Sequence, residues 1–123
     1  MSLDNPKKNE LFADLVATID SWSNAATQAL TSEDDNATIW VEKRLAFATL
    51  RGTLVSHGVP AALVQEVLTE CFEGIAHSFL CILDGATELS DTGRIYAVDE
   101  YGGSLGEGLH EDFDEYLFNQ ARS

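Results

Sequence analysis

The chain is poor in basic residues. It has seven Lys and Arg against 21 Asp and Glu, which gives a formal net charge of −14 at pH 7. A surface with that excess repels phosphate backbones and anionic membranes, so we expect neither nucleic-acid nor membrane binding. The same charge favours cationic protein surfaces or metal ions as partners.

Long apolar runs are also absent, and cysteine is scarce. The longest apolar run, residues 79 to 83, has five members, whereas a membrane-spanning helix needs about 18 or more. Cys71 and Cys81 lie within one predicted helix, about 15 Å apart along its axis, which is beyond disulfide reach. We therefore expect a soluble, cytoplasmic protein with reduced thiols.

The length and the apolar content indicate a single folded domain over residues 1–123. Hydrophobic residues make up 45% of the chain, so the high charge does not by itself indicate disorder. Residues 1–5 and an acidic loop at 31–36 have little to bury. We expect residues 1–5 to be flexible and the loop to be solvated.

Apolar residues recur at three- and four-residue steps, which is the pattern of amphipathic helices. The first predicted helix spans residues 6 to 30, with Asn5 as its N-cap. The second begins at Ser32 or Asn36 and ends at Gly58. Its predicted buried side chains are Ile39, Trp40, Phe47, Leu50 and Leu54.

The third helix, predicted from Pro60 to about residue 83, is the most apolar part of the chain. Its broad apolar face predicts a central position, with Phe72 and Phe79 among the most buried side chains.

The last third of the chain changes pattern. Residues 94 to 98 are rich in β-formers and 101 to 105 supply turn residues, which predicts a small hairpin. A short amphipathic helix is predicted at about 108 to 119. The expected fold is mainly α: an antiparallel helical bundle of three long helices plus a small β-hairpin and a short C-terminal helix.

Four polar residues share one stripe of the third helix: Glu66, Glu70, Glu73 and His77. A Glu and a His one turn apart can both ligate metal, as in helical di-metal carboxylate sites. One hypothesis is therefore a metal-dependent hydrolase that uses Glu70, Glu73 and His77. The alternative, which we favour, is a solvated face with an exposed Glu73–His77 pair and no cofactor.

Acidic residues concentrate near the C-terminus. Residues 84 to 123 hold ten Asp and Glu against two Arg. Acidic side chains favour the first turn of a helix, but their number here exceeds what capping requires. Tyrosines are enriched at protein interfaces. The predicted partner-binding residues are Asp99, Glu100, Tyr101, His110, Glu111, Asp112, Asp114 and Glu115.

Two segments, HSFLCILDG at 77 to 85 and LHEDFDEYLF at 109 to 118, resemble stretches of short uncharacterised bacterial proteins. The resemblance implies a bacterial cytoplasmic origin. It carries over no activity and no functional residue.

These features favour a non-enzymatic acidic interaction protein that binds a basic protein partner, as an inhibitor or an immunity-type protein does. The competing hypotheses are the metal-dependent hydrolase and a ligand-free structural protein that forms a homodimer or larger homo-oligomer.

Overall fold

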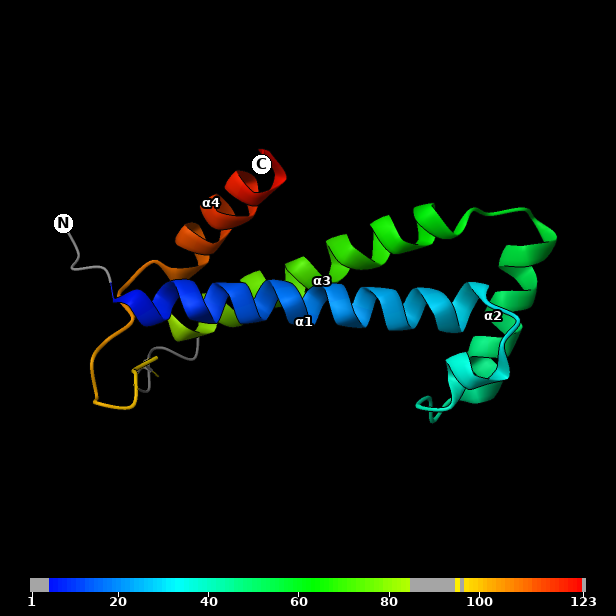
Figure 1. The fold of residues 1–123 in the computed structure, drawn as a ribbon, viewed down its shortest axis with the longest axis horizontal. Helices are drawn as coiled ribbons and strands as arrows, with labels where there is room; N and C mark the ends of the chain where they lie inside the picture. The colour runs from blue at the N-terminus through cyan, green and yellow to red at the C-terminus, as the bar shows by residue number, and fades with distance from the viewer. Residues whose placement is uncertain (1–4, 85–94, 96, 123) are drawn as a thin grey trace. The chain divides into compact units, whose positions relative to one another are not determined.

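The computed structural model describes residues 5–84, 95 and 97–122. Within this part of the chain lie four α-helices and one 3-10 helix (Figure 1): α1 Pro6–Thr31, η1 Asp35–Thr38, α2 Arg44–Ser56, α3 Ala61–Leu83 and α4 Leu109–Arg122. The chain forms two compact units. The first unit comprises Met1–Ala17 and Glu73–Ser123, and the second unit comprises Thr18–Phe72.

Local signals place most helix ends. The Asn5 carboxamide oxygen accepts a hydrogen bond from the Lys7 N–H at 2.9 Å, which confirms the predicted cap of α1. Gly58 follows α2 with a φ of +66°, a left-handed conformation that favours glycine and ends the helix. α3 begins at Ala61, one residue after the predicted start at Pro60.

The predicted β-hairpin is wrong. No strand occurs among the described residues, and around the predicted turn only an isolated antiparallel bridge joins Val98 to Ser104. The Asp99 carboxylate accepts hydrogen bonds from the N–H groups of Tyr101 and Gly103, at 2.9 and 2.8 Å. These local bonds to a side chain compete with a strand ladder and favour a turn. Residues 94 and 96 of the predicted hairpin lie outside the described residues.

The first unit has an aromatic and aliphatic core. Phe12 of α1 and Phe113 of α4 are almost fully buried, and their ring centroids lie 5.3 Å apart. Tyr116 packs against Phe12 at 5.6 Å. Leu80, Leu105 and Leu109 are also buried. This core fixes the face of α4 that points inward and leaves its acidic face in solvent.

The predicted burial of Phe72 and Phe79 is wrong. Phe79 is 52% exposed and Phe72 is half-buried, whereas Leu80 is fully buried and Ala76 nearly so. Because α3 is apolar around most of its circumference, periodicity alone does not identify the side that packs.

The second unit is organised around the C-terminal half of α1. Its buried residues are Ile19, Ser23, Ala26, Thr27, Ala29, Leu30, Val41 and Val64. The Trp40 ring contacts Trp22 and Phe47 edge-on.

The predicted second helix starts too early, and its predicted buried face is wrong. η1 and a short connection precede α2, which contains no buried residue. Ile39, Trp40 and Leu50 are exposed, and Phe47 and Leu54 are half-buried. Asp34 caps η1 by accepting from the Asn36 N–H, which closes a separate short turn.

Candidate functional site

The negative charge is concentrated in the first unit. Its residues include fourteen Asp and Glu against four Lys and Arg, whereas those of the second unit include seven against three. An unequal distribution of charge makes the electrostatic potential more negative over one part of the protein surface than over the rest. The candidate site is therefore sought in the first unit.

The acidic face of α4 consists of Glu111, Asp114 and Glu115, all exposed. Asp112 lies on another side of the helix, half-buried, and its carboxylate pairs with the Lys8 ammonium at 3.0 Å. Glu111 and Asp112 also occupy the first turn, where they interact favourably with the helix dipole. Three of the four predicted carboxylates on α4 thus face solvent.

The loop residues of the predicted site have separate roles. Tyr101 is 87% exposed and Glu100 is exposed, so both are accessible to a partner. Asp99 instead holds the loop. The Asn5 amide, with the N–H groups of Gly103 and Tyr101, holds the pKa of the Asp99 carboxyl below its usual range.

His110 is held at the start of α4 by Asp84, a residue that was not predicted to belong to the site. The buried Asp84 carboxylate accepts from the N–H groups of Leu109 and His110, each at 2.9 Å, and from His110 Nδ1. Burial raises the pKa of Asp84, but these hydrogen bonds outweigh burial and the pKa lies below its ordinary value. Asp84 therefore acts as an N-cap for α4 from the end of α3.

The three candidate metal ligands, Glu70, Glu73 and His77, are divided between the two units. Glu70 is exposed in the second unit, and Glu73 and His77 belong to the first. His77 Nδ1 pairs with Asp114 Oδ1 of α4 at 2.9 Å. No group of three His, Cys, Asp or Glu side chains within the described ranges has the proximity that a metal ion requires.

Cys81 follows His77 by one turn on α3, and its thiol is poorly suited to nucleophilic chemistry. The rings of His77 and His110 meet edge-on at 5.4 Å, and each holds a carboxylate through Nδ1. Burial raises the pKa of the Cys81 thiol, and the charges of Asp84 and Asp114 raise it further. A thiol with a raised pKa is protonated at neutral pH and is a weak nucleophile.

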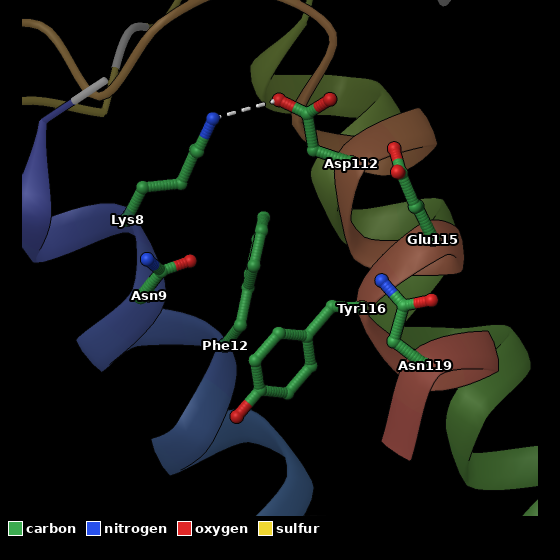
Figure 2. A pocket seen from close by; sticks show the side chains of 7 residues that line it. All are labelled: Lys8, Asn9, Phe12, Asp112, Glu115, Tyr116 and Asn119. Carbon is green, nitrogen blue, oxygen red and sulfur yellow. Dashed lines mark hydrogen bonds and ion pairs between the residues drawn. The ribbon is translucent and has the colours of Figure 1, made fainter. Parts of the chain in front are cut away.

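A pocket of about 310 Å³ opens between the start of α1 and α4, within the first unit. Its lining residues are Lys8, Asn9, Phe12, Asp112, Glu115, Tyr116 and Asn119. Figure 2 shows the rings of Phe12 and Tyr116 next to each other between the two helices, with Lys8 extended toward Asp112. No local sequence pattern marks this pocket, because its two walls are about 100 residues apart in the chain.

No protein-family model, curated protein or solved structure matches this chain. In the part of the chain that the structure describes, no helix has the length and apolar character needed to cross a bilayer.

Proposed function

We propose that this chain is an acidic protein-binding module of the bacterial cytoplasm that recognises a basic protein partner through α4. The exposed acidic face formed by Glu111, Asp114 and Glu115 carries the proposal. It lies in the unit whose residues hold fourteen of the 21 carboxylates. Charge of one sign gathered on one surface raises the rate of encounter with a partner of opposite sign.

Binding to a cationic surface would also block that surface. A basic protein that acts on an anionic substrate presents its positive charges at the substrate site, and an acidic helix face competes for the same position. This is the mode of action expected of an inhibitor or an immunity-type protein. The two exposed loop residues, Glu100 and Tyr101, would add a charge and a flat amphipathic contact.

A three-residue neutralisation tests the proposal. Glu111→Gln, Asp114→Asn and Glu115→Gln together remove the acidic face. The matched control makes the same change in charge in the second unit, at the exposed residues Asp20, Glu66 and Glu70. Tagged wild-type, neutralised and control chains are used to capture proteins from the producing cells at low salt.

We expect at least one cationic protein to be retained by the wild-type and control chains and lost from the neutralised chain. The reason is that three favourable charge contacts disappear, while the net charge of the two variants is equal. Equal retention by all three chains would contradict the proposal, and so would failure to retain a basic protein.

A second candidate function is a homo-oligomeric structural protein, which the exposed apolar face of α3 favours. Ile75, Phe79 and Ile82 are 67%, 52% and 39% exposed, and their spacing places them on one side of the helix. Residues 74 to 83 contain no Asp, Glu, Lys or Arg. A second copy of this acidic chain would therefore meet little like charge along this part of α3.

Light scattering coupled to size exclusion tests this candidate. A homodimer that uses this face is expected to become monomeric on Phe79→Asp, because a buried charge without a partner is costly. Leu45→Asp on α2 is the control, since Leu45 is 81% exposed in the second unit. A monomeric wild-type chain, or a dimer that Phe79→Asp leaves intact, would exclude an oligomer built on this face.

A further inference from the structure

We infer that the pocket between α1 and α4 receives an arginine side chain of the basic partner. The inference rests on the proposed function and deepens it, because it names the group that anchors the partner. Interfaces concentrate their binding energy in a few residues that fill pockets, and arginine is enriched among them.

The charges around the pocket favour a single cation. The charged residues that line the pocket are Lys8, Asp112 and Glu115. Lys8 and Asp112 pair with each other at 3.0 Å, and Lys8 is mostly buried in this contact. Glu115 then gives the lining one excess negative charge, which one guanidinium balances.

The aromatic wall favours a planar cation. The Phe12 ring is 1% exposed and is fixed between Phe113 and Tyr116, with centroids at 5.3 and 5.6 Å. Tyr116 is thereby held in place while remaining half-buried at the pocket (Figure 2). A guanidinium stacks flat on such a ring. Its N–H groups then point outward in the plane of the guanidinium, where they remain free to donate hydrogen bonds.

The polar groups favour arginine over lysine. The Glu115 carboxylate on α4 and the Asn9 amide oxygen on α1 are acceptors on opposite walls of the pocket. Arginine has five N–H donors in a fixed planar arrangement, so it can reach acceptors on two sides, whereas an ammonium is a compact and strongly hydrated charge. Sites for drug-sized ligands span about 300 to 1,000 Å³, and this pocket lies at the lower limit. It therefore suits one side chain.

An NMR titration with N-acetylarginine methylamide tests the inference on the full chain. We expect saturable shifts of the backbone amides of residues 8–12 and 112–119, which contain the pocket lining. The citrulline analogue has the same shape without the charge, and it should cause no saturable shift. The lysine analogue should bind more weakly than the arginine analogue.

Variants locate the interaction. Glu115→Gln should weaken arginine binding about fivefold, the loss that corresponds to a close ion pair in water. Asp14→Asn removes one exposed charge from the same unit outside the pocket, and binding should be unchanged. Tyr116→Phe should retain binding because the ring remains, and Tyr116→Leu should lose it.

The outcomes separate this inference from the proposed function. Arginine binding that Glu115→Gln and Tyr116→Leu leave unchanged, or shifts outside the pocket, would overturn the pocket inference. The proposed function would stand in that case if a basic partner still depended on the acidic face of α4. Equal binding of the arginine and citrulline analogues would also overturn the inference, because charge would then have no part in recognition.

Discussion

Phe113→Ala is expected to lower the free energy of unfolding by about 3 to 5 kcal/mol. Phe113 is fully buried and packs against Phe12, so the substitution removes a large apolar side chain and leaves a cavity in the core of the first unit. A loss of that size is a large share of the roughly 5 to 15 kcal/mol that stabilises a typical domain. Urea denaturation followed by circular dichroism measures it.

Phe118→Ala is the matched control, because it makes the same substitution on the same helix. Phe118 is 58% exposed, and we expect its loss to cost less than about 1 kcal/mol. Similar costs for the two substitutions would mean that α4 packs through a different face from the one described.

Asp84→Ala is expected to have the second largest effect, a loss of about 2 to 3 kcal/mol. Removal of an N-cap acceptor costs up to about 2 kcal/mol, and Asp84 exceeds a typical cap because it accepts three hydrogen bonds, from Leu109 N–H, His110 N–H and His110 Nδ1. Asp84→Asn should recover part of the loss, since a carboxamide oxygen still accepts one hydrogen bond. Chemical denaturation at pH 7 measures the free energy of unfolding of the wild type, Asp84→Ala and Asp84→Asn.

The lowered pKa of Asp84 predicts a pH dependence of defined sign. A carboxyl whose pKa is lower in the folded than in the unfolded state contributes stability above its unfolded pKa, which for an aspartate lies near 3.8. That contribution disappears as the pH falls through the folded pKa. The stability difference between wild type and Asp84→Asn should therefore shrink as the pH falls below about 4. A difference that persists unchanged well below pH 4 would contradict the assigned hydrogen bonds.

The helices could be predicted from the sequence where their signals are local. Asn5 caps α1, Gly58 ends α2 and Pro60 marks the start of α3 to within one residue, as expected from residues within one turn of each helix end. The β-formers of residues 94 to 98 were misleading, because a strand also needs a partner and Asp99 directs the adjacent backbone into a turn.

The packing of the helices could not be predicted in the same way. Periodicity placed Phe79 inside, but its neighbour Leu80 is the buried residue, since α3 offers apolar side chains in several directions. The cap that Asp84 forms on α4 joins residues 25 positions apart, and no local pattern marks it. The two walls of the aromatic pocket are about 100 positions apart, so no local pattern marks the pocket either, whereas the acidity of α4 is visible in the sequence alone.

The acidic face of α4 as a docking surface is tested most directly by the association rate of the recovered partner at different salt concentrations. Between about 50 and 500 mM salt the screening length falls from roughly 14 to 4 Å. We predict that the wild-type rate falls steeply over this range, and that the chain neutralised at Glu111, Asp114 and Glu115 associates more slowly with a weaker salt dependence. Equal rates and equal salt dependence for the two chains would contradict a docking role for α4.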